Sequence, residues 1–95
     1  MKAQAVVMNS ADNTATAAEL IAAGSEVAMS VAGRLVKITV NEPIKFGHKF
    51  AIAAIAKGER IIKYGETIGM ATEAIQVGQH VHVHNLESVR GRGDR

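Results

Sequence analysis

Cysteine and tryptophan are absent from this 95-residue sequence, which also has only one proline, one tyrosine and two phenylalanines. Without cysteine, the chain forms no disulfide bond and offers neither a thiolate metal ligand nor a cysteine nucleophile. With so few aromatic side chains, the hydrophobic share of 47% is largely alanine, valine and isoleucine. This composition favours closely spaced backbone over a deep apolar ligand pocket, and the length suits a single domain.

Strong net charge and long hydrophobic runs are also missing. The 11 basic and 9 acidic residues give a formal charge of +2, which does not indicate a nucleic-acid partner when no basic stripe is interleaved with aromatics. The N-terminal apolar run is too short for a signal peptide, and no window approaches the about 20 apolar residues of a membrane span. We therefore expect a cytoplasmic protein without a membrane partner. A partner chain, or a homo-oligomer when the chain is isolated, would add buried surface that so small a domain lacks.

A short motif, I-x-x-G-x-x-(V/I), occurs three times and begins at Ile21, Ile55 and Ile75. In each copy an apolar residue precedes a glycine, which permits a backbone angle that other residues resist, and a strand is expected to follow. The copies are shorter than solenoid repeats and unevenly spaced. They therefore indicate one structural device used three times within a single domain.

Alternating and β-branched segments predict many short strands. They cover residues 3–8, 26–31, 34–40, 61–65, 66–71 and 80–84, and the second and third form a hairpin around 32–33. Short helical turns are expected at 16–23, 52–56 and 72–75. The result is a mainly β, barrel-like domain over residues 1–87, followed by a polar, flexible tail at 88–95.

Three of the four histidines stand at alternating positions, His80, His82 and His84. Alternate residues of a strand project to the same side, so the three rings are expected on one face and Val81 and Val83 on the core side. Same-side Cβ atoms lie roughly 6.5–7 Å apart, and two imidazoles at that spacing can converge on one metal ion. A solvated strand face that happens to use histidine explains the pattern equally well.

Other candidate site residues lie at turns. His48 follows the only proline in a glycine-containing loop, and such loops can present a side chain at a site. Lys63 and Tyr64 could contact an anionic substrate, while Asp12 and Asn13 read first as a turn or helix cap and second as a ligand pair. An ordinary polar turn explains each of these groups as well.

Two stretches, GHKFAIAAIAKGERIIKYGETIG (47–69) and GQHVHVHNLES (78–88), together resemble the small SAF-type β-clip module of the altronate and galactarate dehydratase family. The resemblance extends from about residue 6 to residue 94. Its most specific parts are Gly47-His48-Lys49, Ile62-Lys63-Tyr64-Gly65, Ile68-Gly69 and His82-x-His84-Asn85. In that family the module is either fused to a much larger dehydratase domain or made as a separate small subunit, which this chain resembles more.

The resemblance implies a function. The family removes water from sugar acids with the help of a divalent metal, typically Fe²⁺ or Mn²⁺, and gives a 2-keto-3-deoxy sugar acid. The chain would then be the small subunit of an altronate-type dehydratase, inactive without a large dehydratase subunit and acting on a sugar-acid substrate. Two alternatives stay open: the small subunit of a sulfolactate sulfo-lyase, and a non-catalytic SAF module that binds carbohydrate or a partner.

Roles for the motif residues follow from that chemistry. β-Elimination needs a base for the proton beside the carboxylate and an acid or metal for the leaving hydroxyl, and neutral imidazole can ligate a metal or move a proton. We therefore predict His48, His82 and His84 as catalytic residues, with His82 and His84 as metal ligands. His80 lies outside the core of the motif. The predicted substrate-binding residues are Lys49, Lys63, Tyr64, Asn85, Asp12 and Asn13.

Overall fold

Nine short strands and no helix are found in residues 4–7, 9–31 and 33–88, the part of the chain that the computed structural model describes. The mainly β fold expected from the sequence is therefore confirmed. No helix in these residues has the length and hydrophobicity of a membrane span. The strands are β1 (Ala5–Val6), β2 (Thr14–Ala17), β3 (Glu26–Val31), β4 (Arg34–Thr39), β5 (Lys49–Ala51), β6 (Arg60–Lys63), β7 (Glu66–Ala71), β8 (His80–Val81) and β9 (Leu86–Ser88).

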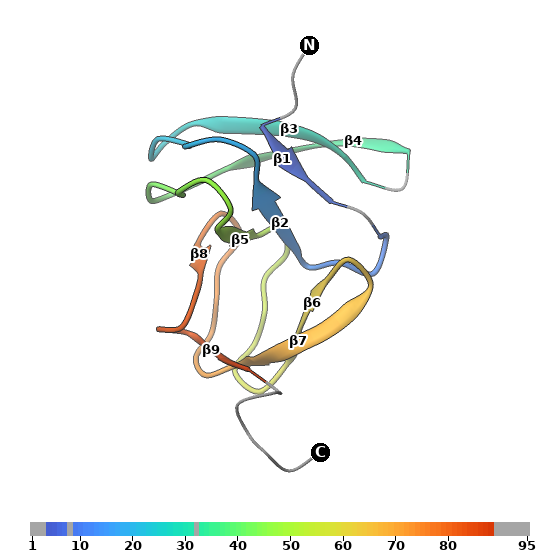
Figure 1. Ribbon diagram of the computed structural model, residues 1–95, viewed down its shortest axis with the longest axis vertical. Coiled ribbons are helices and arrows are strands. Elements are labelled where there is room, and N and C mark those ends of the chain that lie inside the picture. Colours follow the sequence, from blue (N-terminus) through green and yellow to red (C-terminus); the bar gives the residue numbers. More distant parts are fainter. Residues whose placement is uncertain (1–3, 8, 32, 89–95) are drawn as a thin grey trace.

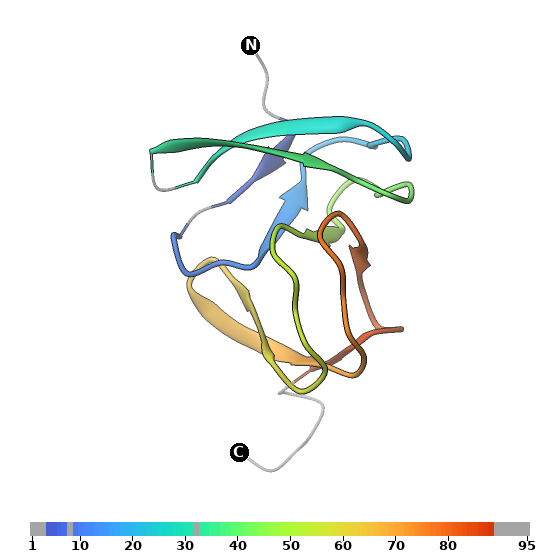
Figure 2. The ribbon, with the colours of Figure 1, turned by 180° about the vertical axis from the view of Figure 1, so that it is seen from behind.

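The strands form three antiparallel sheets, and the one in the middle is β1-β2-β5-β8. The β3–β4 ribbon lies on one side of it and the sheet β6-β7-β9 on the other (Figure 1, Figure 2). Neighbouring residues of a strand point to opposite faces. Accordingly, Phe50 of β5 packs in one hydrophobic cluster with Val27, while Ala51 packs in a second cluster with Ile61. The middle sheet is thus covered by apolar side chains on both faces.

The expected helical turns at 16–23, 52–56 and 72–75 are wrong. Residues 16 and 17 continue β2, and the rest of these segments is bend, turn and isolated bridge. Each segment approaches an isoleucine whose backbone N–H donates across to another turn, not to a carbonyl four residues back. Long-range pairing therefore overrides the helix propensity of these alanine-containing sequences.

The isoleucine–glycine motif occurs four times, one more than the sequence pattern predicted. The additional copy runs from Ile44 to Gly47, and the sequence pattern does not include it because Phe50 stands where the other copies have valine or isoleucine. In all four copies the glycine donates its N–H to a distant carbonyl, over 2.8 Å. All four glycines have a φ between 82° and 88°, so they share one backbone conformation.

The four turns are joined in two pairs. Ile21 and Ile44 exchange two backbone hydrogen bonds of 2.9 Å, and Ile55 and Ile75 exchange two of 2.9 and 2.8 Å. The four isoleucine side chains are at most 2% exposed. Each pair therefore anchors two loops in the interior, and we call the pairs the first turn pair (21–24 with 44–47) and the second turn pair (55–58 with 75–78).

Two glycines of the second turn pair provide a matched test. Alanine at a left-handed position costs about 1–2 kcal/mol, and this strain applies to both Gly58 and Gly78. A Cβ at Gly58 meets no atom within 4 Å, whereas one at Gly78 collides with the carbonyl oxygen of Thr39. Because that collision moves backbone, Gly78→Ala is expected to cost a further about 1–3 kcal/mol. Urea unfolding of both variants measures the difference, and equal losses would contradict the close approach.

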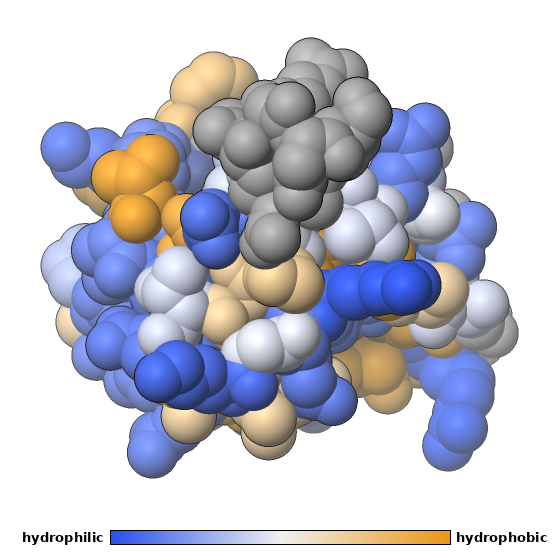
Figure 3. All heavy atoms as spheres, turned by 90° about the horizontal axis from the view of Figure 1, so that it is seen from below, coloured by the Kyte–Doolittle hydropathy of each residue, from blue (hydrophilic) through white to orange (hydrophobic). Residues whose placement is uncertain are grey.

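The C-terminal boundary differs slightly from the expectation. Ser88, assigned above to the tail, is the last residue of β9 and pairs with Gly69. The remainder of the expected tail, residues 89–95, lies outside the described residues. On the face seen from below, hydrophilic residues dominate the visible surface and hydrophobic residues form separate patches (Figure 3).

Candidate metal centre

The histidine-rich segment is a short strand followed by a turn, so the expected strand over 80–84 is wrong. Strand β8 ends at Val81, and the N–H of Asn85 donates to the carbonyl of His82 over 3.0 Å. Val83, expected in the core, is 79% exposed. The chain turns here because the side chain of Asn85 offers the backbone an alternative to a sheet ladder.

Asn85 holds the backbone of two histidines. Its Oδ1 accepts from the N–H of His82 and its Nδ2 donates to the carbonyl of His80, both over 2.9 Å. The residue is fully buried, at 0% exposure, so its amide does not face a ligand. It fixes the turn on which the two imidazoles are carried.

His48 occupies the position after the glycine in the turn 44–47. In the two turns of the second turn pair, this position holds Glu59 and Gln79. Each side chain accepts a hydrogen bond from the backbone N–H three residues earlier, over 2.6 and 2.9 Å. The Nδ1 of His48 instead lies 3.0 Å from the Nε2 of His80. The pairing of β5 with β8 places His48 beside β8, where its ring joins those of the C-terminal histidines.

Three histidines from two segments form the cluster. His48, His80 and His82 each offer a ring nitrogen, and these three atoms lie within 4.8 Å of one another. Their ring centroids are 4.5–5.4 Å apart with interplanar angles of 13–20°. His84 is exposed, and its ring lies 5.3 Å from that of His80 with a tilt of 38°. The structure thus brings His80 into the group and leaves His84 at the rim.

The distances in the cluster suit one metal ion. Two nitrogens bound at about 2.1 Å with a right angle at the ion lie about 3.0 Å apart, which matches the separation of 3.0 Å between His48 and His80. A ring nitrogen of His82 lies within 4.8 Å of the other two. The buried Nδ1 of His82 has no hydrogen-bond partner in the described part of the chain, as expected of an atom that awaits a ligand or an ion.

Two of the three imidazoles are kept neutral. Burial lowers the pKa of His80; the Glu42 carboxylate opposes this shift and the neighbouring histidines add to it. Burial also lowers the pKa of His82, and the charges of His48 and Lys49 add to that shift. Since histidine ordinarily titrates near pH 6.5, both rings are neutral at pH 7 and have lone pairs for a divalent cation.

Sequence reasoning missed Glu42. One of its carboxylate oxygens accepts from the backbone N–H of His80 over 2.9 Å. The two residues are 38 positions apart, and no local pattern connects them. The backbone bond from Asn41 to the carbonyl of Gly78, 3.1 Å long, brings the segments together. Only the fold could reveal this neighbour of the cluster.

Lysines adjoin the histidines. Lys49 follows His48 on β5 and is half-buried; burial lowers its pKa, and the positive charge of Lys63 adds to that shift. Lys63 lies at the end of β6, with its Nζ 5.1 Å from the ring centroid of Tyr64. Of these two lysines, Lys49 acts on His82 of the cluster. Lys49, Lys63 and Tyr64, three of the predicted substrate-binding residues, are thus connected by pairwise interactions.

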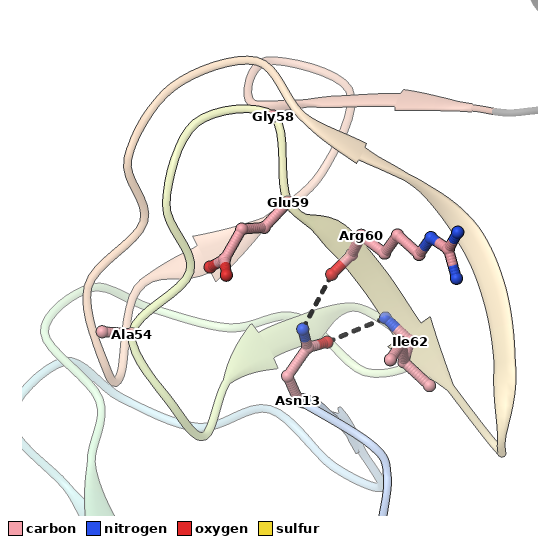
Figure 4. A pocket seen from close by; sticks show the side chains of 6 residues that line it. All are labelled: Asn13, Ala54, Gly58, Glu59, Arg60 and Ile62. Atoms are coloured by element: carbon pink, nitrogen blue, oxygen red, sulfur yellow. Dashed lines mark hydrogen bonds between the residues drawn. The ribbon is translucent and has the colours of Figure 1, made fainter.

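Asp12 and Asn13 bond the backbone of the segment that contains Lys63 and Tyr64. Asp12 accepts from the N–H of Gly65 over 2.7 Å, and the amide of Asn13 bonds the backbone of Arg60 and Ile62 over 2.9 and 2.8 Å. Asn13 also lines an open pocket of about 460 Å³ whose other lining residues are Ala54, Gly58, Glu59, Arg60 and Ile62. Figure 4 shows the Asn13 amide held against the Arg60–Ile62 backbone. None of the four histidines lines this pocket.

Comparison with known proteins connects the sequence to one family. The family described as the altronate/galactarate dehydratase SAF domain matches residues 3–89. Altronate dehydratase of Escherichia coli (strain K12) is 40% identical over 85 residues, which cover 90% of this chain and 16% of that protein. The (2R)-sulfolactate sulfo-lyase subunit alpha of Chromohalobacter salexigens is 42% identical over 57 residues, or 60% of this chain and 61% of that subunit. The chain thus spans less than two thirds of either relative.

Proposed function

Because the chain belongs to the family of altronate/galactarate dehydratase SAF domains, we propose that it is the metal-binding small subunit of an altronate-type sugar-acid dehydratase. The observation that carries this proposal is the cluster of His48, His80 and His82, whose ring nitrogens lie within 4.8 Å of one another. The metal is Fe²⁺ or Mn²⁺, and the partners are a large dehydratase subunit and the sugar-acid substrate.

In this proposal, different residues have different roles in β-elimination. When bound, the ion supplies Lewis acidity toward the departing hydroxyl group. His48, His80 and His82 hold it through ring nitrogens. Lys49 and Lys63 bind the substrate carboxylate, since the charge of Lys63 acts on Lys49 and Lys49 acts on His82. His84, which is exposed and whose ring centroid lies 5.3 Å from that of His80, moves a proton at the rim.

A second polypeptide completes the site in this proposal. The chain covers only 16% of the E. coli altronate dehydratase, which leaves room there for the groups that this chain lacks. Two of the most exposed large hydrophobic side chains of this chain are Phe46, at 74%, and Val83, at 79%. They lie within two residues of His48 and His82 in the sequence. Burying them against a partner would cover the centre and exclude water from it.

The test combines this chain with E. coli altronate dehydratase from which the matching 85-residue segment has been removed. With Fe²⁺ or Mn²⁺, the mixture is expected to convert altronate to a 2-keto-3-deoxy acid, measured as keto-acid formation, while either chain alone is inactive. Full activity of the truncated enzyme alone, unchanged when His82→Ala and His84→Ala are present in this chain, would reject a catalytic contribution. Metal binding without any activity would favour a non-catalytic binding module.

The sulfo-lyase alternative has its own supporting observation. The relative from C. salexigens is named as a subunit, and this chain covers 61% of it, against 16% of the E. coli dehydratase. A separate small chain is thus the form that this relative takes. Sulfite release from (2R)-sulfolactate, in a mixture with the remaining sulfo-lyase chain, distinguishes this function from altronate dehydration.

A further inference from the structure

Glu42 reaches the histidine cluster because two distant segments run side by side. The approach of Gly78 to Thr39 and Val40 is so close that a Cβ on the glycine would collide with the Thr39 carbonyl. Asn41 then donates its N–H to the carbonyl of Gly78 over 3.1 Å. The next residue, Glu42, therefore lies beside His80, the first residue of β8.

The contact is made to the backbone of a cluster histidine. Strand β8 is the edge strand of the middle sheet and pairs with β5. A backbone N–H of an edge strand needs a partner from outside the sheet, and the carboxylate of Glu42 supplies it to His80 over 2.9 Å. A charged acceptor makes this a stronger bond than a neutral one, so it restrains the position of His80.

Glu42 also brings a carboxylate to the cluster. One of its oxygens lies 2.9 Å from the backbone nitrogen of His80, whereas the candidate ligands are all imidazoles. Imidazole ligands bring no negative charge to a divalent ion, and carboxylates outside the ligand shell commonly offset its charge.

We propose that Glu42 is a positioning residue of the metal centre, which fixes His80 through its backbone N–H and offsets the positive charge of the bound ion. This inference rests on the proposed function, because it requires that the cluster binds a metal. Glu42 touches neither substrate nor ion in this role; it acts through His80.

Three variants separate the hydrogen bond from the charge. Glu42→Ala removes both, Glu42→Gln keeps an acceptor and removes the charge, and Glu59→Gln is the matched control. Glu59 makes the same kind of bond to a backbone N–H, over 2.6 Å, in a turn outside the cluster. Each purified chain is titrated with Mn²⁺ by calorimetry and with Co²⁺ by its visible absorption. Urea unfolding of the metal-free chains confirms that each variant is folded.

Glu42→Ala is expected to weaken Mn²⁺ and Co²⁺ binding about 10- to 100-fold, the usual effect of losing a group outside the ligand shell. Glu42→Gln is expected to fall between Glu42→Ala and the wild type, and Glu59→Gln to match the wild type. A merely structural role would lower the stability of the metal-free chain without separating Gln from Ala in metal affinity. If all variants bind as tightly as a metal-binding wild type, the inference fails and the proposed function stands. A wild-type chain that binds neither ion overturns both.

Discussion

Alanine at position 48, 80 or 82 is expected to remove tight metal binding, whereas alanine at position 84 leaves it nearly unchanged. The first three histidines offer the nitrogens that lie within 4.8 Å of one another, and His84 does not. Loss of a ligand is expected to exceed the about 10- to 100-fold cost of losing a supporting group. Titration of each variant with Co²⁺ and Mn²⁺ measures the effect.

His84→Ala is the matched control for this experiment. It removes the same side chain from the same turn, and the ring of His84 already contacts that of His80. The sequence motif alone predicts the opposite ranking, since it names His82 and His84 as the ligands and leaves His80 aside. Retention of affinity in His80→Ala with loss in His84→Ala would therefore favour the motif over the geometry.

The second large effect is expected at Asn85, on stability. Asn85→Ala leaves the N–H of His82 and the carbonyl of His80, which now face a fully buried side chain, without their partner. Each unpaired buried group costs about 1–3 kcal/mol, so the variant is expected to lose about 2–6 kcal/mol. Because small domains are stable by about 5–15 kcal/mol, urea unfolding will show a much lower midpoint.

Gln79→Ala is the comparison variant. Its side chain also accepts from a backbone N–H within a turn, over 2.9 Å, but at an exposed position. Water replaces the lost partner there, so the expected cost is about 0.5–1.5 kcal/mol. Similar losses in the two variants would show that water reaches the turn of Asn85, and the assigned burial would then be wrong.

Local patterns were sufficient for the hairpin of β3 and β4. The alternation over 26–31 and 34–40, with a glycine between, predicted both strands, and β4 ends only one residue early. Period and turn chemistry are local properties, so the sequence reveals them directly. The expected helical turns failed for the opposite reason: isoleucines 21, 55 and 75 pair with turns far along the chain.

The candidate site also combines residues that a local motif identifies with an arrangement that only long-range contacts determine. His48, His82 and His84 were identified from the motif, but their arrangement depends on contacts that no local pattern encodes. The Asn85 side chain turns the chain after Val81, which leaves His84 at the rim. His80 joins the cluster because β8 pairs with β5. Glu42 could not have been predicted, because only the fold brings it to His80.

Because the histidines follow turns of both turn pairs, metal binding by the cluster would also affect the stability of the fold. His48 follows a turn of the first pair, and His80 and His82 follow a turn of the second. An ion bound by these rings would cross-link loops that belong to different turn pairs. At a free concentration 100 times its dissociation constant, such an ion adds about 2.7 kcal/mol to the folded state. Supply of that metal would then govern how long the chain survives proteolysis, independently of turnover.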